Sequence, residues 1–308
     1  KKDVQAFEAR LMDILLALHR DLKTKTYTHG GYRFFRISDP KPRDIHKASV
    51  RDRLVHHAIY WILSPFFDRM FIADSYSCRK GKGTHRALDR FQAFARKASC
   101  NHTKTAWVLK CDVKKFFASI DQEILLSILQ ERIQDHNILW LLEKVIGSFC
   151  SEQKENILDS RLHGSDKRRR GLPLGNLTSQ LLVNIYLNES DQFVKHKLRA
   201  RYYIRYADDF VLFSRDHEKL EGWLISIKEF LWERLHLRLH PDKVFIRTVA
   251  SGVDFLGWVH FPDHRVPRTA TKRRMLKKIC EKNVESYLGL LRWGNAYTLQ
   301  KGLKSIAE

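Results

Sequence analysis

The feature that constrains this chain most is a pair of adjacent aspartates, Asp208 and Asp209, in a short turn between two apolar segments. Residues 202–206 lead into the turn and residues 210–214 lead out, and both segments are typical of the strands of one β-hairpin. Two solvated turn residues that bond local N–H groups are the ordinary alternative. However, paired negative charges between buried strands lose hydration and repel each other, which raises a pKa or requires a cation. The hairpin setting therefore favours a cation site.

A third carboxylate has the same setting, because Asp112 ends the apolar strand predicted over residues 105–111. Taken alone, Asp112 could be a simple strand-end cap. If this strand lies beside the hairpin, Asp112 and Asp208 converge at one edge of a sheet. Converging carboxylates suit Mg²⁺, and two such ions about 3.5–4 Å apart support in-line nucleotidyl transfer. We therefore expect two Mg²⁺ ions at Asp112, Asp208 and Asp209.

The charge balance indicates a polyanionic partner. The 308 residues include 56 Lys and Arg against 35 Asp and Glu, a net charge of +21, which points to nucleic acid or an acidic membrane surface. The sequence has no apolar run long enough to cross a bilayer, so we expect no membrane partner. Its five cysteines include no CxxC pair, which fits a reducing cytoplasm.

The order of predicted elements indicates an α+β chain with a short antiparallel sheet covered by helices on one face. Helices are expected over 3–22, 49–67, 84–98, 121–132, 179–198 and 218–235, further strands over 244–248 and 255–261, and a basic helical tail from 265. A hairpin or loop is expected over 27–37 and a polar exposed loop over 151–170.

Five motifs in order make the chain resemble a bacterial-type reverse transcriptase. They are Asp112–Phe117, Gly171–Gln180, Tyr206–Asp209, Pro241–Lys243 and Phe255–Gly257. The resemblance implies a right-hand polymerase fold, with an N-terminal helix and fingers over 1–104, a palm over 105–262 with helical insertions at about 121–170, and a thumb over 263–308. It also implies RNA-directed DNA polymerase activity, with template RNA, primer, cDNA product and dNTPs as partners. In such enzymes the second aspartate of the Tyr206–Asp209 box often lies a shell further from the metals.

Within that family, the chain is most similar to the reverse transcriptases of diversity-generating retroelements, at Leu174, at Asn176–Gln180 and over Asp74–His85. This resemblance implies a bacterial or phage-encoded enzyme that makes errors opposite template adenines and uses a small basic oligomeric accessory protein. The alternatives are a retron, group II intron or phage-defence reverse transcriptase. An alternative of another class is a non-catalytic RNA-binding maturase or scaffold.

The resemblance also assigns the nucleotide contacts. Phe117 would exclude a 2′-hydroxyl, or it is a core residue beside Phe116. Arg79 and Lys82 would clamp the triphosphate, or they are solvated loop charges. Leu174 and Gly175 would pack under the base pair.

Three further roles follow from the resemblance. Lys243 would protonate pyrophosphate, or it is a surface lysine after a proline turn. A basic cluster on a thumb helix would contact the duplex backbone, or it is an ordinary solvated face. That cluster comprises Lys272, Arg273, Arg274, Lys277 and Lys278. Phe255 and Gly257 would belong to the grip on the primer.

Overall fold

The computed structural model describes residues 2–38, 42–151, 169–280 and 282–307. Contacts divide the chain into two compact units, each made of three segments. The first comprises Lys1–Ile72, Val113–Asp191 and Glu229–Arg238, and the second comprises Ala73–Asp112, Gln192–Lys228 and Leu239–Glu308. Most of the loop predicted over 151–170 lies outside the described residues.

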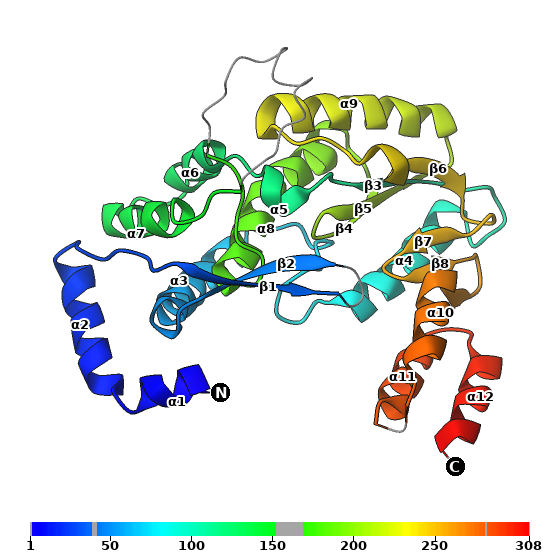
Figure 1. Cartoon of the computed structure of the whole chain (residues 1–308). Helices are drawn as coiled ribbons and strands as arrows, with labels where there is room; N and C mark the ends of the chain where they lie inside the picture. The colour runs from blue at the N-terminus through cyan, green and yellow to red at the C-terminus, as the bar shows by residue number, and fades with distance from the viewer. Residues whose placement is uncertain (1, 39–41, 152–168, 281, 308) are drawn as a thin grey trace, which may run out of the picture. The chain divides into compact units, whose positions relative to one another are not determined.

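The first unit is mainly helical. Its elements are α1 (Lys2–Glu8), α2 (Leu11–Lys23), β1 (Tyr32–Ile37), β2 (Arg43–Ala48), α3 (Val50–Asp68), α5 (Phe116–Ser119), α6 (Gln122–Gln130), α7 (His136–Ile146) and α8 (Leu177–Gln192). Strands β1 and β2 form an antiparallel hairpin (Figure 1). Helix α6 begins where predicted, because the Asp121 carboxylate accepts bonds from the backbone N–H groups of Glu123 and Ile124.

The single helix predicted over 3–22 is wrong, since α1 and α2 are separate. The backbone N–H of Arg10 donates to Phe7 O at 3.1 Å, three residues back. This tighter turn ends α1, and Arg10 has a non-helical conformation before α2 begins.

The second unit contains the antiparallel sheets. Its elements are α4 (Thr84–Ala98), β3 (Trp107–Asp112), the π-helix η1 (Phe193–Lys197), β4 (Tyr202–Tyr206), β5 (Asp209–Ser214), the 3₁₀ turn η2 (Pro241–Lys243), β6 (Phe245–Thr248), β7 (Val253–Phe255), β8 (Trp258–His260), β9 (Arg265–Pro267), α10 (Thr269–Lys278), α11 (Val284–Leu291) and α12 (Tyr297–Ala307). Helix α9 (His217–Leu235) begins in this unit and ends in the first. The sheets have the strand orders β4-β5-β3-β6 and β7-β8-β9, so the predicted α+β class is confirmed.

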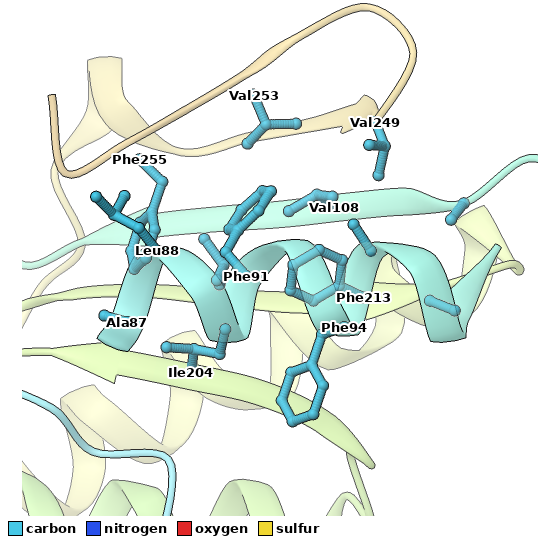
Figure 2. Packing of buried hydrophobic residues seen from close by; sticks show 14 of the residues in the cluster. Ala87, Leu88, Phe91, Phe94, Val108, Ile204, Phe213, Val249, Val253 and Phe255 are labelled. Carbon is cyan, nitrogen blue, oxygen red and sulfur yellow. The ribbon is translucent and has the colours of Figure 1, made fainter. Parts of the chain in front are cut away.

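Helix α4 supplies the core that backs the four-stranded sheet. Its residues Leu88, Phe91 and Phe94 are buried in one cluster with residues of the strands and of the segment after β6, as Figure 2 shows. The rings of Phe91 and Phe213 are 4.9 Å apart and meet edge to face. This apolar layer holds the strands that carry the aspartates.

The strand predicted over 255–261 is confirmed only at Trp258–His260, which form β8, because a tight turn interrupts the range at its start. Phe255 closes β7 and pairs with Trp258 of β8. Between them, Leu256 and Gly257 have φ angles of +51° and +85°, as the two central residues of a primed hairpin turn require. The sequence did not predict this turn, because the apolar pair Phe255-Leu256 is typical of a strand.

Candidate active site

The two adjacent aspartates lie at a two-residue turn rather than the three-residue turn that the sequence suggested. Tyr206 and Asp209 are the closing pair of the β4–β5 hairpin, and Ala207 has a φ of +53°. The buried Arg205 donates from Nη1 to the carbonyl oxygen of Ala207 at 3.1 Å. Asp208 therefore lies in the turn, while Asp209 is already the first residue of β5.

The third aspartate meets this hairpin from a distant part of the sequence. Strands β3 and β5 are antiparallel neighbours, and their register places Asp112 directly opposite Asp209. Opposite residues of such strands have Cα atoms about 4.5–5.5 Å apart. The expected neighbouring of this strand and the hairpin is confirmed, and the carboxylate-bearing residues share one end of the sheet.

The two carboxylate oxygens of Asp209 have different surroundings. One oxygen, Oδ2, lies 3.4 Å from Lys110 Nζ, whereas Oδ1 is buried and has no hydrogen-bond partner. Burial raises the pKa of Asp209 to about 7; the Lys110 ammonium opposes this shift, and the charges of Asp112 and Asp208 add to it. A buried oxygen without a donor is costly and calls for a cation or a proton.

Lys243 is brought to the same end of the sheet. Its Nζ donates to Asp112 Oδ1 at 2.8 Å, and the backbone N–H of His240 donates to Asp112 O at 2.7 Å. The His240 ring accepts a bond from the N–H of Asp242, which caps the turn η2. The turn that carries Lys243 is thus fastened to the end of β3.

The donor set at this end of the sheet suits a hard divalent cation, because it consists of carboxylate oxygens. Within the described part of the chain, no three His, Cys, Asp or Glu side chains are grouped as they would be around an ion. The ammonium groups of Lys110 and Lys243 lie on Asp209 and Asp112 instead. The partnerless Oδ1 of Asp209 still leaves an acceptor that a cation would satisfy, so these residues fit a divalent metal.

The loop before α4 is fastened to β4, beside the aspartate turn. The N–H of Arg205 donates to Asp74 O at 3.0 Å, and the N–H of Tyr76 donates to Arg205 O at 2.9 Å. The Asp74 carboxylate accepts two bonds from Arg90, and Thr84 donates to the Tyr206 hydroxyl at 3.0 Å. The loop is therefore positioned by the same strand that leads into the turn.

The two basic residues predicted to clamp a triphosphate fold back onto this loop. Arg79 donates to Ser75 O at 3.0 Å, and Lys82 donates to Ala73 O at 2.6 Å. Their role as a clamp stays a prediction.

The remaining residues predicted to contact the nucleotide belong to the first unit. The N–H of Leu172 donates to Phe117 O at 2.8 Å, and the N–H of His46 donates to Leu174 O at 2.9 Å. Gly175 has a φ of +111°, and a Cβ there would lie 2.7 Å from Ile45 Cγ2. The glycine is required by this backbone conformation and this close approach.

The basic cluster predicted on a thumb helix lies on α10. Lys272, Arg273, Lys277 and Lys278 are exposed, while Arg274 is half-buried. Met275 on the same helix is buried in a cluster with residues of α11 and α12. The cluster thus lies at the surface of α10, and its contact with a duplex stays a prediction.

Phe255 differs from the expectation for a nucleic-acid contact. Its side chain is 0% exposed and its ring lies 5.5 Å from that of Phe91. The side chain is a core residue, because β7 packs on α4. Gly257, in the following turn, accepts a backbone bond from Arg268 at 3.0 Å.

Sequence reasoning missed Lys110. The strand Trp107–Cys111 is otherwise apolar, and Lys110 precedes Asp112 by two residues, which places both on one face of the strand. A lone charge in a buried strand, in step with a candidate ligand, is the signal that could have found it.

Comparison with known proteins agrees with this geometry. Protein YkfC of Escherichia coli (strain K12) is 28% identical over 252 residues, covering 71% of this chain and 63% of that protein. The group II intron-encoded protein LtrA of Lactococcus lactis subsp. cremoris is 23% identical over 320 residues, covering 83% and 50%. The chain thus spans less than two thirds of the length of these relatives.

Solved structures show the same fold. Telomerase from Candida albicans, determined with a fragment of telomeric RNA, has a TM-score of 0.57 at 15% identity, over 86% of this chain and 50% of that one. Telomerase has the right-hand polymerase fold, as the sequence predicted for this chain.

The profile described as reverse transcriptase (RNA-dependent DNA polymerase) matches residues 38–260, well over half of the chain. Together with the aspartates at one end of the paired strands β3 and β5, this match shows that the chain belongs to the reverse transcriptase family.

Proposed function

We propose that this chain is an RNA-directed DNA polymerase that adds dNTPs to a primer 3′-hydroxyl. The observation that carries the proposal is the register that sets Asp112 opposite Asp209, beside Asp208 in the hairpin turn. Membership of the reverse transcriptase family supports the same chemistry.

Asp112 and Asp208 would hold two Mg²⁺ ions, and Asp209, the first residue of β5, would contribute a further carboxylate to the site. When bound, such ions activate the attacking hydroxyl and stabilise the charge of the leaving pyrophosphate. The chain's own residues do the rest. Lys243, which lies at 2.8 Å from Asp112, would donate a proton to pyrophosphate. Phe117 would exclude the 2′-hydroxyl of a ribonucleotide. Arg79 and Lys82 would hold the triphosphate.

The finer proposal is an error-prone enzyme of a diversity-generating retroelement. Leu174 supports it, because an aliphatic side chain cannot hydrogen-bond a base pair or a sugar and so loosens selection of the incoming nucleotide. The Leu174→Gln variant should then make fewer errors opposite adenine, measured by sequencing the cDNA. An unchanged error spectrum would refute this role.

Similarity to a group II intron-encoded protein favours a second candidate, an intron-type reverse transcriptase. The two candidates differ in partners. The first would bind its own template RNA and a small basic oligomeric accessory protein, whereas the second would bind an intron RNA. Errors concentrated at template adenines would identify the first.

The test of the activity is primer extension on an RNA template with Mg²⁺ and dNTPs. The parent chain should extend the primer and the Asp208→Ala variant should not. Binding of RNA without extension by the parent would instead indicate a non-catalytic maturase or scaffold.

We also propose that fingers, palm and thumb follow the boundaries predicted from the sequence.

In the described ranges 2–38, 42–151, 169–280 and 282–307, no helix has the length and apolar character needed to span a bilayer.

A further inference from the structure

Lys110 is a buried cation inside the sheet that carries the aspartates. It lies on β3 between Val211 of β5 and Phe245 of β6, and its side chain is 7% exposed. Its ammonium lies 3.4 Å from Asp209 Oδ2 and 6.0 Å from the centre of the Phe245 ring. Burying an ammonium is costly unless a carboxylate compensates it, so Lys110 and Asp209 depend on each other.

The second lysine at this end of the sheet is held differently. Lys243 comes from the turn η2, its side chain is 40% exposed, and it lies 2.8 Å from Asp112. A flexible, solvated ammonium can leave a carboxylate at little cost, whereas Lys110 is enclosed by neighbouring strands. One lysine is therefore exchangeable and the other is fixed.

The fixed lysine has two consequences for Asp209. It holds Oδ2, so the carboxylate has one orientation and presents only its other oxygen, which has no partner. It also places a positive charge a few ångströms from the carboxylates, which weakens their attraction for divalent cations.

We propose that Lys110 is a positioning residue of the metal site: it orients Asp209 through Oδ2, remains there when divalent cations bind, and lowers the affinity of the site for them. This inference rests on the proposed function, because it presumes that the aspartates hold divalent ions.

The direct test is binding of Mn²⁺, a paramagnetic probe for Mg²⁺ sites, followed by electron paramagnetic resonance without nucleic acid. Binding that the Asp112→Asn variant loses is assigned to this site. The Lys110→Gln variant should bind Mn²⁺ about tenfold more tightly. Even at an effective dielectric constant of about 20, the repulsion between a nearby unit charge and the cation exceeds the free energy of a tenfold change in affinity. The Lys110→Arg variant keeps the charge and should bind like the parent. Lys219→Gln, at an exposed lysine of α9, is the control and should leave binding unchanged.

A second pair of variants guards against misfolding of Lys110→Gln, which leaves a carboxylate buried alone. The Asp209→Asn variant loses a carboxylate and should bind Mn²⁺ about tenfold more weakly. The double variant Lys110→Gln/Asp209→Asn leaves neither charge unpaired and should regain most of the parent affinity. A purely structural lysine would restore no affinity in the double variant, and that result would overturn the proposal.

Orientation of Asp209 is tested by turnover. Lys110→Gln should lower kcat for primer extension at saturating Mn²⁺ while the KM for dNTP stays unchanged. If the parent chain binds Mn²⁺ at this site and Lys110→Gln binds it equally or more weakly, the role of Lys110 is overturned but the proposed function is not. Absence of any Mn²⁺ binding that depends on Asp112 would overturn the proposed function itself.

Discussion

Replacing Asp209 by asparagine should change how the stability of the protein depends on pH. The native pKa of this carboxyl is about 7, raised mainly by burial, against an ordinary value of 3.8. At a pH between these two pKa values, Asp209 holds a proton in the native chain that it has lost in the unfolded chain. The stability of the parent therefore falls as pH rises through this range. The asparagine variant carries no such proton and lacks this loss.

The size of the effect follows from the width of that window. Each pH unit is worth about 1.4 kcal/mol, and the loss levels off as the pH approaches 7. From pH 5 to pH 7 the free energy of unfolding of Asp209→Asn should therefore rise relative to the parent by about 2 kcal/mol.

Urea unfolding with EDTA, followed by tryptophan fluorescence at several pH values, measures this difference. Asp13→Asn, at an exposed aspartate of α2, is the control and should give a difference that does not vary with pH. A difference for Asp209→Asn that stays flat from pH 5 to pH 7 would refute the argument that Asp209 is buried with one oxygen unsatisfied.

Three further variants test other parts of the molecule. Gly175→Ala should destabilise the protein by about 1–3 kcal/mol in urea unfolding, because φ is +111° and Ile45 is close; parent-like stability would contradict this. Phe117→Ala should admit ribonucleotides in primer extension, and continued exclusion would assign Phe117 to the core alone. Lys272→Gln/Lys277→Gln should weaken duplex binding and reduce the slope of log affinity against log salt by about 0.9 per lysine; an unchanged slope would place α10 away from the duplex.

The hairpin that carries the adjacent aspartates could be predicted from the sequence, whereas its register with the partner strand could not. The strands around the Tyr206–Asp209 turn could be predicted because short apolar runs and adjacent aspartates are local signals. The pairing of β3 with β5 was only an expectation, since register is set by tertiary packing. The register places Asp112 opposite Asp209, whereas the sequence predicted only that Asp112 and Asp208 would converge at one edge of the sheet.

The features that the sequence missed depend on backbone conformation or on contacts between residues that are distant in the sequence. The break between α1 and α2 and the turn at Leu256 depend on backbone conformations that these residue types seldom mark. Lys110 was overlooked because its significance depends on Asp209, far away in the sequence. Phe255 was assigned to nucleic acid by resemblance, but the packing of β7 on α4 buries it.

The chemistry proposed for this chain requires Asp112 and Asp208 to hold a pair of divalent ions. A crystal structure with Mn²⁺, an RNA–DNA duplex and a non-reactive dNTP analogue measures this directly through anomalous scattering. We expect two peaks about 3.5–4 Å apart, bound by carboxylate oxygens of Asp112 and Asp208, with Lys110 still on Asp209 and Lys243 released from Asp112. Ordered nucleotide with no peak at these carboxylates would contradict it.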